Sequence, residues 1–383
     1  MTDIQQVAID LIKCAITGQP QKLPENLQLS PVANLLRRHG LITLGYAGAS
    51  LCGFDPQSTV LSKMQDMYCM EFLHSERQLE NLDRLYQAFE EKGIEYMPVK
   101  GAVMKHIYPT HELRAMSDAD ILIHAEQKEE IGAIMESLGF TFKSESDHEW
   151  NWINSELKLE LHKRLVSSDE KNYYNYFGDG WAWAKTKEGC RWSMSQEDAF
   201  IFEFSHFTRH YCKGGIGLRH LVDLWVHLYN APNMDKTYVR KQLEKMHLGD
   251  FYDNVLTAIE ALFGSGTWTP EAEYICQFVF GQGTVSHDAE IAYSAAAGGT
   301  SSAKQGKFRI FLRRVFPARK HLDWNYPKLK KVPLPLAWVA RWFSLLGKRD
   351  VVQNRLDQMG KVTDESVNAY RQSLEFVGLE ILE

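Results

Sequence analysis

Apolar residues recur at helical spacing through the first part of the chain. The interval of three and four residues repeats one face of an α-helix. This spacing is found for Ile4, Ala8, Leu11, Ile12 and Ala15. It recurs less regularly for Met67, Met70, Leu73, Leu79, Leu82 and Leu85. Pro20, Pro24 and Pro31 mark loops between these helices. Residues 1–90 are therefore predicted to form an N-terminal helical region.

The pattern changes after Gly93 to short apolar runs typical of strands. In the last of them Leu157, Leu159 and Leu161 alternate with polar residues, as expected for a strand with one buried face. The predicted elements are a strand at 94–101, a short helix at 102–107, a strand at 118–124, an amphipathic helix at 126–138, and a hairpin of 149–154 with 156–165. This order predicts an α+β fold, with a small mixed β-sheet core at 91–190 flanked by helical regions.

Helical patterns return after Ser195, where Ser195 and Asp198 resemble a capping box. A helix is expected from Leu218 to Leu228, and a Gly/Ala-rich linker at 281–303. These patterns predict a helical domain over 191–300 and a C-terminal helical arm over 301–383.

Charge and cysteine usage narrow the functional class. The net charge of −6 argues against general nucleic-acid binding. The segment 304–349, with thirteen Lys/Arg, one acid and several aromatic residues, keeps RNA or an acidic lipid surface open as a partner, although a packed helical arm is preferred. The six cysteines form no C-x-x-C pair, and no leader or membrane-spanning run is found. A cytoplasmic protein is therefore predicted.

The candidate chemistry begins with two aspartates at the start of a strand. Asp118 and Asp120 are two residues apart, so strand geometry places both carboxylates on one face. Glu160 lies on the polar face of a later strand, and pairing of the two strands would bring it alongside. Such oxygen ligands suit Mg²⁺ or Mn²⁺. Three carboxylates on adjacent strands meet the needs of two-metal phosphoryl or nucleotidyl transfer.

A triphosphate substrate also requires positive charge near these acids. Lys100 and Arg114 precede the aspartate pair, and Gly101 allows close backbone approach to a phosphate. These three residues are predicted to contact phosphates.

The motif as a whole resembles a known family. PVKG, Y-P, R-x-x-S-D-A-D-I-L-I and L-E-L-H resemble the uncharacterised bacterial nucleotidyltransferase family, which is related to the DNA polymerase beta superfamily. The matching residues are Lys100, Gly101, Tyr108, Pro109, Arg114, Asp118, Asp120, Glu160 and His162. The strong resemblance covers about 95–165, and a weaker one covers 204–224 and 308–342.

The resemblance implies a nucleotidyltransferase that moves a nucleoside monophosphate from an NTP, such as ATP, to a small-molecule or protein acceptor. Asp118, Asp120 and Glu160 would hold two metal ions, Ser117 would join Lys100, Gly101 and Arg114 at the nucleotide, and His162 would lie in the cleft. The chain departs from the wider superfamily, which has a Gly-Ser or Gly-Gly pair shortly before D-x-D. Here Lys100-Gly101 stands instead, with Gly101 seventeen residues before Asp118.

Further candidates lie in the next helices. His206 and His210 share a helix face and could bind a metal with Asp223, or could line the cleft by hydrogen bonding. Arg219 and Asp223 are four residues apart and are expected to form an ion pair, either on the surface or in the cleft wall.

Two other functions use the same signals. A D-x-D glycosyltransferase would hold Mn²⁺ and a nucleotide sugar, but it normally has a large βαβ fold before D-x-D, where this chain has helices. A catalytically silent nucleotide-fold binding module would keep the fold without turnover. A preference for free NTP over nucleotide sugar would exclude the glycosyltransferase. Metal-dependent release of pyrophosphate from NTP would exclude the silent binding module.

Overall fold

The computed structural model describes residues 1–24, 27–213, 215–282, 332–345 and 363–380, with single residues between 312 and 329. The chain divides into two compact units. The first comprises residues 1–207 and 217–284, and the second comprises 208–216 and 285–383. The first unit contains the sheet and all three predicted acids.

Four helices precede the sheet. They are α1 (Asp3–Thr17), α2 (Leu29–Arg38), α3 (Ile42–Leu51) and the long α4 (Thr59–Lys92). Thr2 caps α1 through a hydrogen bond from the Gln5 amide, which satisfies one of the free N–H groups at the helix start. Helix α4 ends at Gly93, whose left-handed backbone (φ 67°) lets the chain turn directly into the first strand.

Seven strands of the described residues form one mixed sheet, in the order β3-β4-β5-β2-β1-β7-β6. The strands are β1 (Tyr96–Val99), β2 (Ala119–Ile123), β3 (Thr141–Glu145), β4 (Glu149–Ile153), β5 (Lys158–His162), β6 (Thr186–Glu188) and β7 (Arg191–Ser193). The pairs β2–β5 and β1–β7 are parallel, and the other pairs are antiparallel. The predicted hairpin is β4–β5, and the predicted strand at 118–124 is β2.

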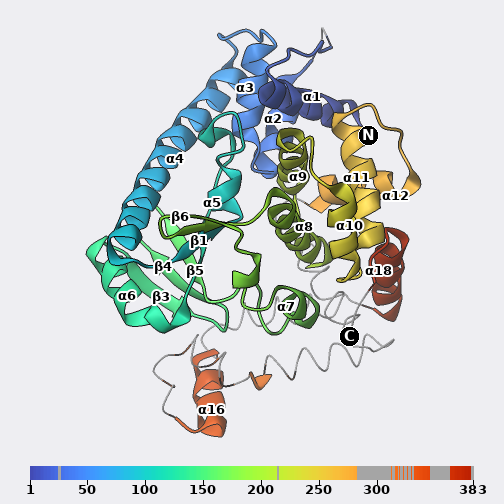
Figure 1. The fold of residues 1–383 in the computed structure, drawn as a ribbon. Helices are drawn as coiled ribbons and strands as arrows, with labels where there is room; N and C mark the ends of the chain where they lie inside the picture. Colours follow the sequence, from blue (N-terminus) through green and yellow to red (C-terminus); the bar gives the residue numbers. More distant parts are fainter. Residues whose placement is uncertain are drawn as a thin grey trace. The chain divides into compact units, whose positions relative to one another are not determined.

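The two faces of the sheet have different partners. One face packs on α4 and on α6 (Lys128–Ser137), which lie along one side of the sheet in Figure 1. This core contains Leu82, Leu85 and Phe89 of α4, Ile131, Ile134 and Met135 of α6, and the apolar strand residues between them. The alternation of β5 sends Leu159 and Leu161 into this core. Glu160 and His162 therefore lie on the opposite face.

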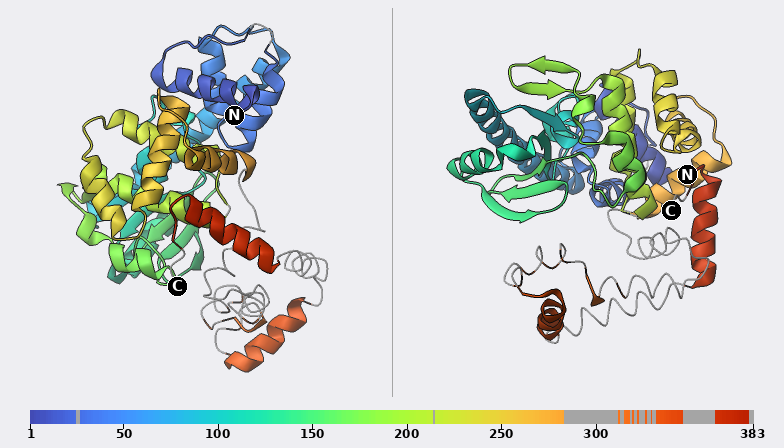
Figure 2. Two further views of the ribbon diagram at one scale, coloured as in Figure 1. Left: turned by 90° about the vertical axis from the view of Figure 1, so that its right-hand side faces the viewer. Right: turned by 60° about the horizontal axis from the view of Figure 1, so that its bottom comes forward.

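Helices later in the chain lie on that opposite side. They are α7 (Lys171–Phe177), α8 (Gln196–Lys213), α9 (Leu218–Asn230), α10 (Lys236–Glu244), α11 (Gly249–Phe263) and α12 (Pro270–Gln282). The Asp198 amide donates to Ser195 Oγ at the start of α8, so the predicted cap is present. Figure 2 shows the same helices from two further sides, with α8 to α12 coloured from green to orange.

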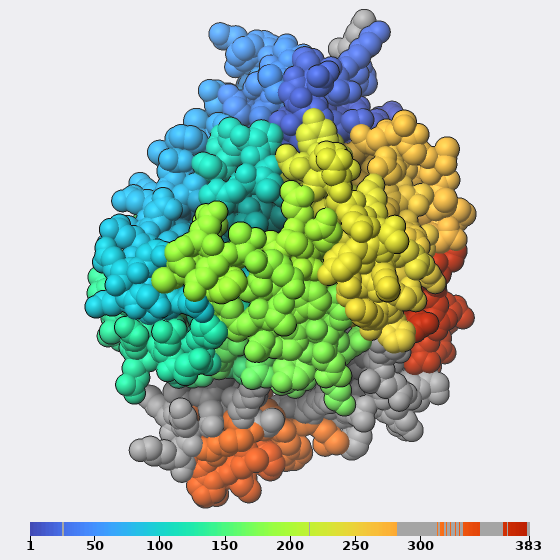
Figure 3. Space-filling view, viewed as in Figure 1, coloured from blue at the N-terminus to red at the C-terminus, as the bar shows by residue number. Residues whose placement is uncertain are grey.

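Short connecting elements complete the first unit. They are α5 (Gly101–Met104), η1 (His111–Leu113), η2 (Ala125–Gln127) and η3 (Trp181–Trp183). The segment after β1, drawn in teal, lies directly against α9 in the space-filling view (Figure 3). Asn230 of α9 donates to the Ile107 carbonyl in this contact.

The second unit contains α16 (Leu334–Leu345) and α18 (Asp364–Phe376) among its described residues. Phe316 packs edge-on against Trp338 and Trp342, so these three aromatic residues form a local cluster. Most of the basic segment 304–349 and nearly all of the expected linker 281–303 lie outside the described residues.

The predicted α+β class, with a small mixed sheet and flanking helices, is confirmed. Three strands were missed, because β3, β6 and β7 are largely exposed and so lack the alternation of buried and polar positions. No helix among the described residues has the length and apolar character needed to cross a membrane.

Candidate active site

The register of three central strands sets the position of the acids. Asp120 lies opposite Glu160 in the parallel pair β2–β5 and opposite Val99 in the antiparallel pair β1–β2. Side chains opposite each other in a ladder point to the same face of a sheet. Asp118 lies two residues before Asp120, at the entrance to β2. The backbone therefore brings the three predicted acids together on the face away from α4 and α6.

Basic side chains are already bound to these carboxylates. Lys100 Nζ lies 2.6 Å from Asp120 Oδ1, and His162 Nε2 lies 2.8 Å from the same oxygen. Lys158 bridges the other two acids, with its Nζ 3.3 Å from Asp118 Oδ2 and 2.5 Å from Glu160 Oε1. Each of the three acids therefore contacts the ammonium group of a lysine.

Burial and charge act differently on the two central acids. Burial favours the neutral form of Asp120, but Lys100 and His162 outweigh it and lower the pKa of this carboxyl well below its ordinary value. Burial raises the pKa of Glu160, and the neighbouring charges of Asp120 and Glu149 raise it further, against the hydrogen bond from Lys158. Asp120 is thus held as an anion, whereas an additional cation would stabilise ionised Glu160.

The donor atoms fit a divalent cation. One ligand atom each from Asp120, Glu160 and His162 lies within 4.8 Å of the others. A neighbouring group of His148, Glu149 and His162 meets the same limit. Carboxylate oxygens with one imidazole suit Mn²⁺ and related divalent ions, and the carboxylates alone suit Mg²⁺. Asp118 is linked to the first of these groups by Lys158, which contacts both Asp118 and Glu160.

The turn before α5 has an unusual backbone. Lys100 has φ 47° and ψ −121°, a left-handed region that a residue with a side chain rarely adopts. Gly101 follows in close contact with the loop before β2. A Cβ atom there would lie 3.2 Å from Arg114 Nη1 and 3.3 Å from the Asp118 carbonyl oxygen. Lys100, in this strained turn, contacts Asp120, and a Cβ atom at position 101 would require its neighbours to shift by a few tenths of an ångström.

We expect Gly101→Ala to displace the start of β2 rather than unfold the protein. The added methyl group meets the Asp118 backbone, so it should cost about 1–3 kcal/mol of unfolding free energy, as for overpacking. Denaturant unfolding measures this loss. Gly132→Ala on α6, where a Cβ would meet no atom within 4 Å, is the control and should not destabilise. Equal stability of Gly101→Ala and wild type would contradict the close contact.

The loop that leads into β2 is held in place by contacts with several other elements. Arg114 forms a two-point ion pair with Asp223 of α9, with Nε–Oδ1 at 2.9 Å and Nη2–Oδ2 at 3.1 Å. Tyr108 also donates to Asp223 Oδ1, at 2.6 Å. Both partners of the ion pair are buried. This buried group therefore joins α9 to the loop that carries the aspartates.

Three more side chains bind the backbone of the same loop. Lys105 Nζ donates to the Arg114 carbonyl at 3.0 Å, Gln78 of α4 donates to the Met116 carbonyl at 2.8 Å, and Arg219 of α9 lies 3.4 Å from the Ala115 carbonyl. Burial lowers the pKa of Lys105 to about 8. These contacts hold the residues immediately before Asp118 at fixed positions.

The residues proposed from sequence thus separate into two groups. Asp118, Asp120, Glu160, Lys100 and His162 lie together, and the Ser117 hydroxyl donates to Asp118 Oδ1 at 3.0 Å. Arg114 and Asp223 lie in the buried group described above. The expected ion pair of Arg219 with Asp223 was wrong, because Asp223 binds Arg114 and Tyr108 while Arg219 reaches a backbone carbonyl.

Two further candidates from the sequence are the histidines of α8, His206 and His210. The His206 ring stands 6.4 Å from the His220 ring of α9, within the first unit. His210 falls in the part of α8 that belongs to the second unit. Their metal or cleft role stays a prediction.

Some site residues were missed by sequence reasoning. Lys158 was recognised only as a polar strand position, although its alternation with Glu160 and His162 places it on the same face. His148 and Glu149 belong to no motif that the sequence analysis identified. They reach the site because β4 pairs with β5, which puts Glu149 opposite His162.

One of three comparisons with known proteins found a match. No curated protein and no solved structure matches the chain. The family described as uncharacterised nucleotidyltransferase matches residues 25–264, which include every acid and base of the cluster. The match spans more than half of the 383 residues. The chain therefore belongs to this uncharacterised nucleotidyltransferase family.

Proposed function

We propose that this protein is a metal-dependent nucleotidyltransferase that transfers a nucleoside monophosphate from an NTP to a small-molecule or protein acceptor. Asp118, Asp120 and Glu160 are the proposed ligands of two Mg²⁺ or Mn²⁺ ions. The family match supports nucleotidyl transfer in general. The proposed metal ions and their role in the transfer depend on the cluster of acids.

The observation that carries the proposal is the in-register pair of Asp120 and Glu160, with Asp118 joined to Glu160 through Lys158. Like charges this close repel unless cations lie between them. Lysine ammonium groups stand on the carboxylates in this structure. We infer that these groups mark the positions where the acid cluster accepts positive charge.

Bound divalent ions would polarise the phosphate oxygens and lower the pKa of the attacking hydroxyl. The protein itself supplies the three oxygen ligands, and His162 and Lys100 keep Asp120 ionised. The buried Arg114–Asp223 pair keeps the aspartate loop in place, so less reorganisation is needed when substrate binds.

The lysines would exchange partners when substrate and metal bind. Lys100 and Lys158 contact carboxylates in this structure, and both would be released to contact phosphate oxygens once the acids bind metal. Ser117 and Gly101 border the same site. Arg114 was also predicted to bind phosphate, but its Nε–H and one N–H of Nη2 donate to Asp223, so a phosphate could use only the three N–H groups that remain.

The test is pyrophosphate release from each NTP with Mg²⁺ or Mn²⁺, with mass spectrometry of the protein to detect self-modification. Glu160→Gln should lower this turnover about 10²-fold or more, because one preorganised charge is lost while the shape is kept. Glu136→Gln, the same change at an exposed position of α6, should leave turnover unchanged. Full activity of Glu160→Gln would remove this residue from the metal site.

Two other functions give different results in the same assay. A D-x-D glycosyltransferase would cleave nucleotide sugars and leave free NTPs intact, and helices α1–α4 before β1 count against it. A catalytically silent binding module would bind NTP without releasing pyrophosphate. The family match and the complete set of three acids favour the nucleotidyltransferase.

A further inference from the structure

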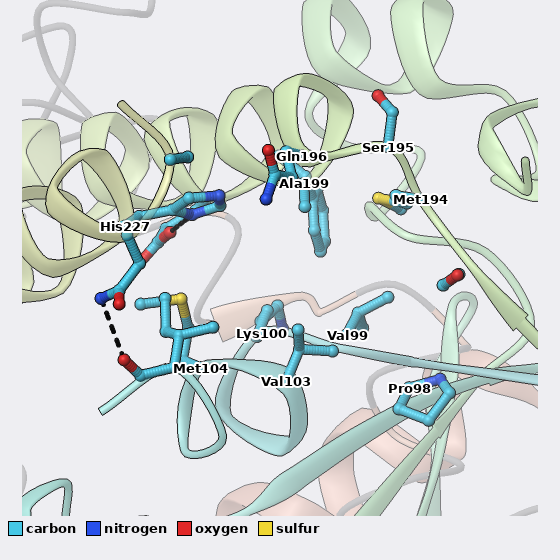
Figure 4. Close-up of a pocket in the computed structure, with 16 residues that line it drawn as sticks. Pro98, Val99, Lys100, Val103, Met104, Met194, Ser195, Gln196, Ala199 and His227 are labelled. Carbon is cyan, nitrogen blue, oxygen red and sulfur yellow. Dashed lines mark hydrogen bonds and ion pairs between the residues drawn. The ribbon is translucent and has the colours of Figure 1, made fainter. Parts of the chain in front are cut away.

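A mostly apolar cavity of ≈ 170 Å³ lies beside the acid cluster. Figure 4 shows Val99, Lys100, Val103 and Met104 on one wall, with Gln196, Ala199 and His227 on the facing wall. The first wall is the end of β1 with α5, and the second is formed by α8 and α9. A closed apolar cavity of about 150 Å³ is enough to bind benzene. The space therefore fits one compact ring system and excludes a large group.

Two polar side chains that line this cavity, Glu203 and Gln196, can accept hydrogen bonds. The Glu203 carboxylate lines it and is bound through Oε2 to His227 Nδ1 at 2.8 Å. Burial raises the pKa of Glu203, and the contact with His227 opposes that rise. Gln196 adds an amide that both donates and accepts. An anionic group would be repelled by Glu203, whereas a ring with an amino group would find an acceptor.

Lys100 connects the cavity with the acids. Its Nζ is 2.6 Å from Asp120 Oδ1 and 6.0 Å from the centre of the Phe202 ring, which lines the cavity. A nucleotide whose phosphates lie at Lys100 and the acids can therefore extend its base toward Phe202. This ring is buried, and it forms part of the apolar wall that such a base would approach.

We propose that this cavity binds the nucleobase of the NTP and that Glu203 selects bases with an exocyclic amino group. This inference rests on the proposed function, since it assumes that the triphosphate lies at the acids. A carboxylate accepts from the amino group of cytosine, and a side-chain amide pairs with the amino edge of adenine. A carbonyl at the same position would face the carboxylate with two acceptors and no proton between them.

The experiment uses calorimetric titration of the full chain with α,β-methylene analogues of four NTPs and Mg²⁺. ATP and ITP differ by an amino group against a carbonyl, and CTP and UTP differ in the same way. We expect the ATP analogue to bind about tenfold or more tightly than the ITP analogue, and the CTP analogue more tightly than the UTP analogue. Glu203→Gln should reduce both ratios to within about threefold, because its amide also donates.

A second variant tests the space rather than the charge. Ala199→Leu fills the cavity and should weaken the ATP analogue at least about tenfold, while inorganic triphosphate, which has no base, binds as to wild type. Ala133→Leu, at an exposed position of α6, is the control and should change neither. Thermal melting of each variant verifies its folding.

The outcomes separate this inference from the proposed function. Equal binding of all four analogues, with no effect of Ala199→Leu, overturns the base pocket and leaves the nucleotidyltransferase proposal standing. An equal loss of inorganic triphosphate and of the ATP analogue in Ala199→Leu also overturns the base pocket. Failure of every NTP analogue to bind wild-type protein overturns both.

Discussion

Asp120→Asn should abolish metal-dependent NTP turnover, with a loss of about a thousandfold or more. Asparagine keeps the shape of Asp120 but removes the charge at the centre of the cluster, where Lys100, His162 and Glu160 meet. Loss of one preorganised polar group at the reacting centre costs about 10²–10³-fold, and Asp120 would in addition be a metal ligand, so its loss should reach the upper end of this range or exceed it. Pyrophosphate release under saturating Mg²⁺ or Mn²⁺ measures the effect.

Asp118→Asn is the informative companion. It should also lose activity, but its effect on folding should differ, because the Asp118 side chain is 35% exposed and that of Asp120 is 5% exposed. We expect Asp118→Asn to stay within about 0.5 kcal/mol of wild type. Asp120→Asn should cost about 1–3 kcal/mol, since Lys100 and His162 lose a charged partner.

Metal binding gives a readout that does not depend on turnover. Titration of Mn²⁺ followed by its electron spin resonance signal should show weaker binding in both variants than in wild type. Wild-type Mn²⁺ affinity together with full turnover in either variant would remove that aspartate from the metal site.

Arg114→Ala should have the largest effect on stability, about 3–5 kcal/mol of unfolding free energy. The change leaves the Asp223 carboxylate buried without the guanidinium that holds it. Burial by itself raises the pKa of Asp223, and Arg114 is the main group that lowers it, so the remaining carboxylate would be poorly compensated. Urea unfolding at neutral pH measures the loss.

The double variant Arg114→Met with Asp223→Leu is the control for this interpretation. It removes both charges, so it should recover much of the stability that Arg114→Ala loses. If Arg114→Ala is as stable as wild type and only NTP binding is weakened, Arg114 is a phosphate ligand and the structural role is wrong. Arg114→Lys, which cannot form the two-point contact, should fall between wild type and Arg114→Ala in stability.

Local sequence was enough to predict the strands and acids of the site. A carboxylate pair followed by ILI must lie at the start of a buried strand, and period-two alternation puts Glu160 and His162 on the polar face of theirs. Both features depend on neighbours within a few residues. The strands β6 and β7 carry no such alternation, since β7 is held by pairing with β1 and β6 by pairing with β7, rather than by burial of one face.

The partners of the charged residues could not be predicted in the same way. Arg219 and Asp223 fit the helical spacing for an ion pair, but Asp223 binds Arg114, which is 109 residues away in sequence. Spacing along one helix states which side chains can meet, whereas packing of α9 on the aspartate loop decides which ones do.

By itself, the sequence determined the α+β class, the helical region before the sheet, and the face of each strand on which the acids lie, because these follow from periodicities of two and 3.6 residues. The tertiary structure decided the rest. Strand register put Asp120 opposite Glu160 and brought Glu149 to His162. Packing of α8 and α9 beside β1 enclosed the cavity at Lys100 and buried the Arg114–Asp223 pair. These contacts join residues far apart in the chain, and long-range pairing is set by the free energy of the whole fold rather than by any local pattern.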